Sequence, residues 1–181
     1  MHSVGAKGFD VQSLTPALRN LWLLLISTNF MSLVFPFLLF LNSACQQGWI
    51  GNGTLCYKLF TASKLTWENA KKECEKWHTN LVKVDSREEN DFIKTNVLAT
   101  ETNDDYWIGL SDSAKEDDWM WTDGTRLGLV HGYKNWGSNQ PDNYGNNEDC
   151  VVIRRESDPN YSGKWYDQPC SRKRKYICEN P

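Results

Sequence analysis

The six cysteines of this 181-residue chain all lie between Cys45 and Cys178, and the residues before Cys45 contain none. An even number of cysteines confined to one part of a chain, behind an apolar leader, predicts three disulfides formed in an oxidising compartment. Spacing alone leaves the pairing open. A zinc site is not indicated, because the sequence has neither a CxxC nor an HxxxH pair.

The leader contains a long apolar run, residues 21–41, that follows Arg19. The run is long enough to cross a bilayer, and two interpretations follow. In one, residues 1–44 are a signal peptide cleaved near Ala44; in the other, the run is the signal anchor of a type II membrane protein. Polar residues and a proline interrupt the run, and Cys45 follows without a stalk, so we favour cleavage and secretion. Met31 offers an alternative start that leaves a signal of typical length.

Residues 45–181 contain no linker, repeat or low-complexity tract, which predicts a single domain. The formal net charge of −3 gives no sign of the basic face that a nucleic-acid-binding domain needs. Two sequons, which begin at Asn52 and Asn160, predict N-glycosylation and are compatible with secretion.

The early part of this domain is patterned for strands and helices. Residues 48–60 alternate loosely and indicate strands around a turn at 51–53. Thr66 is placed to cap a helix, and the apolar stripe of that helix would consist of Trp67, Ala70, Cys74 and Trp77. A second helix would begin at a capping box formed by Ser86 and Glu89, and its apolar residues would be Phe92, Ile93 and Leu98.

The later part of the domain combines short strands with a long polar stretch. Residues 106–110 predict a strand, as do the closing segments 151–155, 164–166 and 175–179. Two helices followed by a small sheet predict an α+β domain. The intervening residues 111–149 are rich in Gly, Asp and Asn and carry few helix or strand signals. A stretch of this length inside a compact domain indicates a functional loop, and a metal ion is one candidate for what holds it.

Oxygen-bearing side chains are concentrated in and just after this stretch. They are Asp112, Glu116, Gln140, Asp142, Asn143, Glu148, Asp149 and Asp167. Calcium takes six to eight oxygen ligands from carboxylates, amides and water, and a bound dication would relieve the repulsion between crowded carboxylates. The alternative is a loop that is acidic only because it is solvated. The spacing excludes an EF-hand.

The cysteine spacing, together with four short motifs, resembles the C-type lectin-like family in its long form. The motifs are WIGL at 107–110, QPD at 140–142, NEDC at 147–150 and YICE at 176–179. The resemblance covers the chain from Cys45 onward, and perlucin-like secreted lectins are near relatives. It implies two helices packed on small antiparallel sheets with a long calcium-binding loop. It also implies the disulfides Cys45–Cys56, Cys74–Cys178 and Cys150–Cys170.

The resemblance further implies a sugar site in which the ion and the side chains around it hold the sugar hydroxyls. The residues at the ligand positions for both calcium and sugar are Gln140, Asp142, Glu148 and Asp167. An amide that precedes an acid, as in QPD, resembles the galactose-type order, because an amide can donate where a carboxylate only accepts. Pro141 would be cis in a calcium-loaded relative. We expect galactose or GalNAc-type glycans more than mannose-type ones.

Four aromatic residues near this site have separate expectations. Tyr144 stands where galactose binders carry a ring that stacks on the sugar, although an ordinary surface tyrosine is an equal alternative. Trp136 is expected in the core, with support of the loop as the alternative. Trp165 and Asp167 match the outer members of the family's Trp-Asn-Asp triplet, but the middle position is Tyr166. A neutral phenol is a poorer calcium ligand than an amide oxygen, so this departure predicts a weaker site.

An auxiliary calcium site is implied by residues that match ligand positions in relatives, namely Asp112, Glu116, Glu148 and Asp149. The alternative is that Asp112 and Glu116 are ordinary charges of the loop. Asn143 stands where an acid is often found, which predicts weak binding there. The basic run 172–175 is expected to be a solvated turn, with a sulfated-glycan patch as the alternative.

The function expected from these features is that of a secreted, calcium-dependent lectin. An enzyme is not indicated, since no Ser-His-Asp or Cys-His set can be assembled. One alternative is a lectin-like module that binds protein or mineral surfaces without sugar, and another is a type II membrane lectin receptor. A homo-oligomer is compatible with the sequence.

Overall fold

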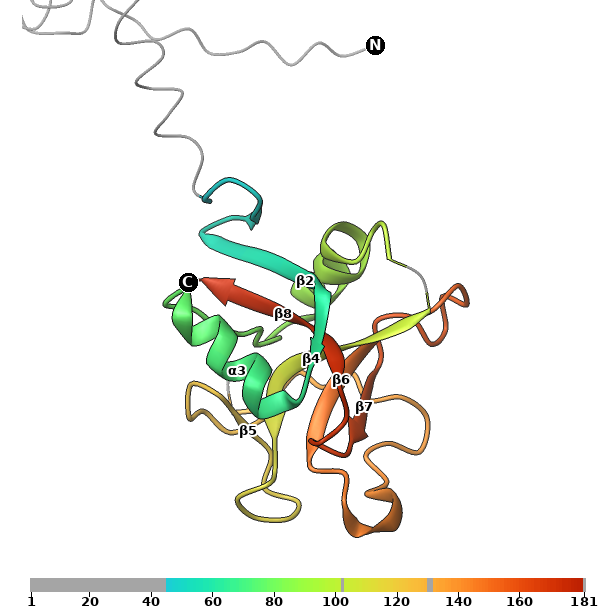
Figure 1. The fold of residues 1–181 in the computed structure, drawn as a ribbon. Coiled ribbons are helices and arrows are strands. Elements are labelled where there is room, and N and C mark those ends of the chain that lie inside the picture. The colour runs from blue at the N-terminus through green and yellow to red at the C-terminus, as the bar shows by residue number, and fades with distance from the viewer. Residues whose placement is uncertain (1–44, 102, 130–131, 181) are drawn as a thin grey trace, which may run out of the picture. The chain divides into compact units, whose positions relative to one another are not determined.

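The computed structural model describes residues 45–101, 103–129 and 132–180 (Figure 1). The predicted signal peptide or anchor, residues 1–44, lies outside the described residues. Within the described part of the chain, no helix is both long enough and apolar enough to cross a membrane.

The strands pair into one connected sheet with the order β1-β2-β8-β4-β6-β7, while β3 pairs with β8 and β5 with β4. The strands are β1 Ile50–Asn52, β2 Leu55–Leu65, β3 Asn80–Leu81, β4 Asp104–Ser111, β5 Met120–Trp121, β6 Cys150–Arg155, β7 Trp165–Gln168 and β8 Arg174–Asn180. The β4–β8 pair is parallel and the other pairs are antiparallel. The predicted α+β class is confirmed, and the parallel pair makes the sheet mixed. Each predicted strand is present, with β2 and β4 extending further than the patterns indicated.

Helix α3, Trp67–Lys76, packs against one face of this sheet (Figure 1). Thr66 is its N-cap residue as predicted, but its side chain makes no capping hydrogen bond. The first helical N–H, on Trp67, instead donates to the carbonyl of Cys170 at 3.1 Å. Ala70 and Cys74 are buried as the stripe predicts. The prediction that Trp77 belongs to the buried stripe is wrong, because Trp77 is the C-cap residue of the helix and its side chain is 48% exposed.

The second predicted helix is two elements in the structure. Helix α4, Arg87–Phe92, gives way to a π-helical turn η2, Ile93–Val97, which no local propensity signals. The capping box is present in part. The Oγ of Ser86 accepts from the N–H of Glu89, whereas the Glu89 carboxylate accepts from the N–H of Asp85 instead of closing the box on Ser86.

The alternation of β4 divides the core between the two faces of the sheet. Tyr106, Ile108 and Leu110 contribute to the cluster that includes η2, and Trp107 contributes to the cluster beneath α3. Gly109 lies between them where a Cβ atom would come within 2.7 Å of the carbonyl oxygen of Leu81, so only glycine fits. The WIGL motif is therefore a packing signature of the fold.

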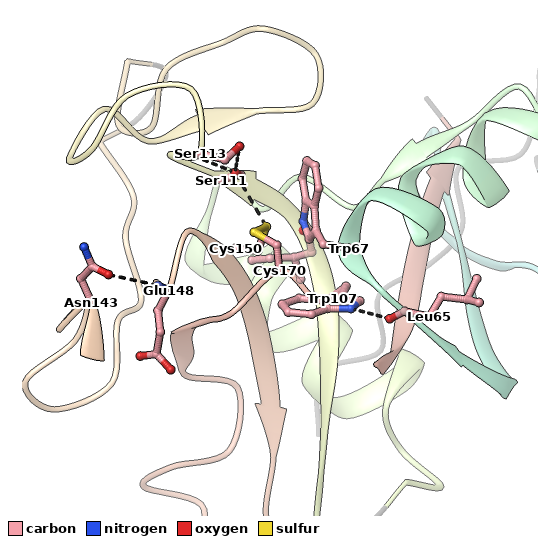
Figure 2. Close-up of a disulfide and its surroundings, with 10 residues drawn as sticks. Leu65, Trp67, Trp107, Ser111, Ser113, Asn143, Glu148, Cys150 and Cys170 are labelled. Atoms are coloured by element: carbon pink, nitrogen blue, oxygen red, sulfur yellow. Dashed lines mark hydrogen bonds between the residues drawn. A yellow bond between two sulfur atoms is a disulfide. The ribbon is translucent and has the colours of Figure 1, made fainter. Parts of the chain in front are cut away.

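Two buried indoles in the α3 cluster are fully satisfied by the backbone. The Nε1–H of Trp67 donates to the carbonyl of Ile108 at 2.8 Å. The Nε1–H of Trp107 donates to the carbonyl of Leu65, also at 2.8 Å (Figure 2). These bonds fix α3 and β2 to the central strand, because a buried N–H without an acceptor would cost about 1–3 kcal/mol.

The three disulfides have the pairing that the resemblance implied. They are Cys45–Cys56, Cys74–Cys178 and Cys150–Cys170. The second ties α3 to the last strand, and the third joins the start of β6 to the turn that follows β7 (Figure 2). This third bridge therefore holds β6 to the end of β7.

Candidate metal centre

Three carboxylates from separate segments meet at the loop end of β6 and β7. Asp142 comes from the QPD loop, Glu148 from the segment before β6, and Asp167 from β7 itself. One oxygen of each lies within 4.8 Å of the others. Asp167 is fully buried, Glu148 is buried and Asp142 is exposed. The cluster therefore opens to solvent on the side of Asp142.

Backbone hydrogen bonds from the QPD loop orient the buried carboxylate of Asp167. Its Oδ2 accepts from the N–H of Asp142 at 3.0 Å and from the N–H of Asn143 at 2.7 Å. The Oε1 of Gln140 in turn accepts from the N–H of Asp167 at 3.2 Å. The Gln140–Pro141 peptide bond is cis, as expected.

The Glu148 side of the cluster is held by the turn that follows the QPD loop. The Oδ1 of Asn143 accepts from the N–H of Glu148 at 3.0 Å (Figure 2). The Oε2 of Glu148 accepts from the N–H of Tyr144 at 3.2 Å. Asn143 adopts a left-handed conformation with φ of 41°, which asparagine tolerates better than most residues. Asn143 is thus a structural residue of the site, a role that neither its residue type nor a motif predicts.

The electrostatics of the cluster suit a cation. Burial raises the pKa of Glu148 and of Asp167, and the charge of Asp142 raises both further. Three carboxylates and the amide oxygen of Gln140 form a set of hard oxygen donors, which is the set that calcium prefers. The residues present therefore fit a calcium ion, with water completing the coordination.

A second acidic group surrounds Asp112 at the end of β4. Asp112 is buried, and its Oδ2 accepts from the N–H of Asp117 at 3.0 Å. Its Oδ1 has no hydrogen-bond partner among the described residues. Burial raises the pKa of Asp112 to about 6, and the charges of Glu116 and Asp149 add to the effect. The N–H of Asp112 also donates to the carbonyl of Asp149 at 3.1 Å. Among the described residues, the close carboxylate cluster contains Glu148 together with Asp142 and Asp167, and it does not contain Asp112, Glu116 or Asp149.

The aromatic residues near the loop differ in their placement. Tyr144 is 80% exposed beside the cluster, so its ring is open to a ligand. Trp136 is partly buried and makes edge contacts with the rings of Trp119 and Trp165 at 5.0 and 5.9 Å, which confirms the expectation of a packing role. The ring of Tyr166 lies under the guanidinium of Arg154, 3.8 Å from its centroid.

The basic run and the sequons also have distinct surroundings. Arg172 and Lys173 are exposed, whereas Lys175 forms ion pairs with Glu101 and Asp104, so the run does not present four free charges. Asn160 is exposed, while the partly buried Asn52 hydrogen-bonds to the side chain of Tyr57.

The family model described as the lectin C-type domain matches residues 63–180, which is most of the chain. The chain belongs to the C-type lectin family. Members of this family bind carbohydrate and are not typically enzymes.

Curated relatives of this C-type lectin include a hepatic lectin and an asialoglycoprotein receptor. It is 35% identical over 144 residues to the hepatic lectin of Gallus gallus, a match that covers 80% of this chain and 63% of the relative. It is 34% identical over 143 residues to asialoglycoprotein receptor 2 of Homo sapiens, covering 76% of this chain and 41% of the relative. The chain therefore spans about two fifths to three fifths of these relatives.

Solved structures of C-type lectins share the fold. The carbohydrate-recognition domain of the mouse scavenger receptor C-type lectin is 36% identical with a TM-score of 0.65, and the match covers 75% of this chain and 97% of that one. CEL-I from Cucumaria echinata is 32% identical with a TM-score of 0.65, with 75% and 96% covered.

Proposed function

We propose that this C-type lectin is a calcium-dependent carbohydrate-binding protein with a galactose-type preference. The observation that carries the proposal is the convergence of Asp142, Glu148 and Asp167 within 4.8 Å beside Gln140. The ion supplies a Lewis-acidic centre for two neighbouring sugar hydroxyls when it is bound. Asp142 and Glu148 accept hydrogen bonds from those hydroxyls, whereas the amide of Gln140 can also donate. This order of donor and acceptor favours galactose over mannose.

Tyr144 is proposed to add an apolar contact. Its ring is exposed next to the carboxylate cluster, and its backbone N–H is fixed on Glu148. An aromatic face can stack on the apolar face of galactose, which contributes area and orientation at little entropic cost. The names of two relatives, a hepatic lectin and an asialoglycoprotein receptor, describe proteins that bind glycans or glycoproteins, which supports a glycan ligand for this chain.

We also propose that Asp112, Glu116, Glu148 and Asp149 hold an auxiliary calcium ion. The support is the buried Oδ1 of Asp112 that lacks a hydrogen bond among the described residues. Residues 1–44 are proposed to be a signal peptide, residues 45–181 the lectin domain, and Asn52 and Asn160 glycan acceptors of a secreted protein. Retention of the leader as an anchor would instead make the protein a type II membrane lectin receptor. No catalytic role is proposed, and self-association is compatible with the proposal.

A second candidate function rests on Tyr166. Its ring packs against the guanidinium of Arg154, and a neutral phenol is a poorer calcium ligand than the amide oxygen of the family's asparagine. A module that binds protein or mineral surfaces without sugar would tolerate that poorer ligand.

Retention on galactose-agarose separates the two functions. We expect retention in millimolar calcium, release by EDTA, and loss of retention in Asp142→Ala and Glu148→Ala. Glu75→Ala, at an exposed position on α3, is the control that removes a carboxylate away from the site. Failure of the wild-type protein to be retained, or retention of both site variants, would refute the lectin proposal.

A further inference from the structure

The alternation of β7 places the Tyr166 ring away from the carboxylate cluster. Trp165 and Asp167 are buried on the side of the cluster, and Tyr166 is partly exposed on the other side. The guanidinium of Arg154 covers one side of its ring at 3.8 Å from the centroid. Arg154 is itself fixed, because its Nε donates to the Oδ1 of Asp105 at 2.9 Å. The ring is therefore held in a defined position by its neighbour on β6.

The same ring also contacts the turn that leads into the QPD loop. A Cβ atom at Gly137 would lie 2.6 Å from the Cζ of Tyr166, so the Gly137 backbone lies directly against the ring. The N–H of Gly137 donates to the carbonyl of Trp165 at 2.8 Å. The carbonyl of Gly137 accepts from the N–H of Gln140 at 3.2 Å. A short chain of contacts thus runs from Arg154 through Tyr166 and Gly137 to the first residue of QPD.

We propose that Tyr166 is a positioning residue that holds residues 137–142 in their ligand-binding conformation without touching the ion or the sugar. A cation–π contact of this kind is worth about 0.5–1 kcal/mol at a partly exposed site, and the close contact with Gly137 adds to it. Compared with a site that has the family's asparagine, this site therefore has one oxygen donor fewer at position 166. In exchange, its loop is ordered by contacts within the protein. The inference rests on the proposed function, because this loop supplies two of the proposed ion ligands.

Hydrogen exchange in EDTA, without sugar, tests this role directly. In Tyr166→Asn we expect the peptide 137–147 to exchange about tenfold faster than in the wild type, which corresponds to about 1.4 kcal/mol of lost local stability. Tyr166→Phe keeps the ring, the cation–π contact and the contact with Gly137, so it should retain wild-type protection. The β4 peptide 104–111 should exchange alike in all three proteins, which separates a local effect from a global one.

Unchanged exchange of residues 137–147 in Tyr166→Asn would overturn the proposal, as would equal acceleration in Tyr166→Phe. If Tyr166→Asn does not fold, Arg154→Lys serves in its place, since it removes the planar guanidinium from the ring. Faster local exchange in that variant supports the proposal, and wild-type exchange refutes it. Because calcium and sugar are absent from the measurement, a failure of lectin activity leaves this result interpretable by itself.

Discussion

Replacement of Asp112 by asparagine should stabilise the domain in EDTA and reduce the stabilisation that calcium provides. The pKa of Asp112 rises from its ordinary value of 3.8 to about 6, chiefly because of burial. The folded state therefore holds the proton more tightly than the unfolded state. The stability that this group contributes is fully present below pH 3.8 and is lost as the pH rises through 6. At pH 7.5 the buried, ionised group costs stability.

The size of that cost follows from the shift. A difference of about 2.2 pKa units corresponds to an upper limit of about 3 kcal/mol at 1.36 kcal/mol per unit. Asparagine removes the charge and keeps an oxygen for the N–H of Asp117, but its amide N–H groups need acceptors at a buried position. We therefore expect Asp112→Asn to raise the free energy of unfolding by about 1–2 kcal/mol in EDTA.

In millimolar calcium the same substitution removes a proposed ligand, so the variant should gain less from calcium than the wild type does. Urea unfolding at pH 7.5, with and without calcium, measures both free energies. Glu75→Gln removes one exposed charge far from the loop and controls for net charge. A variant that is destabilised in EDTA would refute the electrostatic reasoning. A calcium response equal to that of the wild type would refute the role of Asp112 as a ligand.

Two further predictions concern the stability of the fold outside the candidate site. Burial raises the pKa of Glu179 from 4.5 to about 7, so its contribution to stability is present below pH 4.5 and is lost as the pH rises through 7. In EDTA, Glu179→Gln should therefore reduce the change in the free energy of unfolding between pH 5 and 8 by up to about 3 kcal/mol, as measured by urea unfolding, and an unchanged pH dependence would contradict it. Removal of the disulfide Cys74–Cys178, which spans 104 residues, should cost about 4.7 kcal/mol against about 2.8 kcal/mol for Cys45–Cys56, which spans 11. Equal losses in the two Cys→Ala double variants, measured by urea unfolding, would show that loop entropy does not set the difference.

Much of the fold could be predicted because its signals are local. The period of two along residues 106–110 fixes which side chains face each core cluster, and the cysteine spacing matched a family whose pairing the structure reproduces. The exposure of Trp77 and the π turn at Ile93–Val97 could not be read in this way. Both depend on how the ends of α3 and α4 meet the sheet, which helical periodicity does not encode.

The candidate site, like the fold, could be predicted only in part. The oxygen donors at 140, 142, 148 and 167 were identifiable by residue type and motif. The hydrogen bonds that orient these donors were not identifiable. The bond that the Oδ1 of Asn143 accepts, and the backbone N–H bonds that Asp167 accepts, form only in the specific conformation of the folded loop. Tyr166 was recognised as a departure from the family pattern. Its contacts with Arg154 and Gly137 came only from the folded neighbours on β6 and the preceding turn.

The most direct test of the central claim is the melting temperature of the wild-type domain with and without calcium, repeated with galactose. A ligand that binds the native state stabilises it by about 2.7 kcal/mol at one hundred times its dissociation constant. We predict that millimolar calcium raises the melting temperature, and that galactose raises it further only when calcium is present. A melting temperature that calcium leaves unchanged, or a galactose effect that persists in EDTA, would contradict the account of Asp142, Glu148 and Asp167 as a calcium-dependent sugar site.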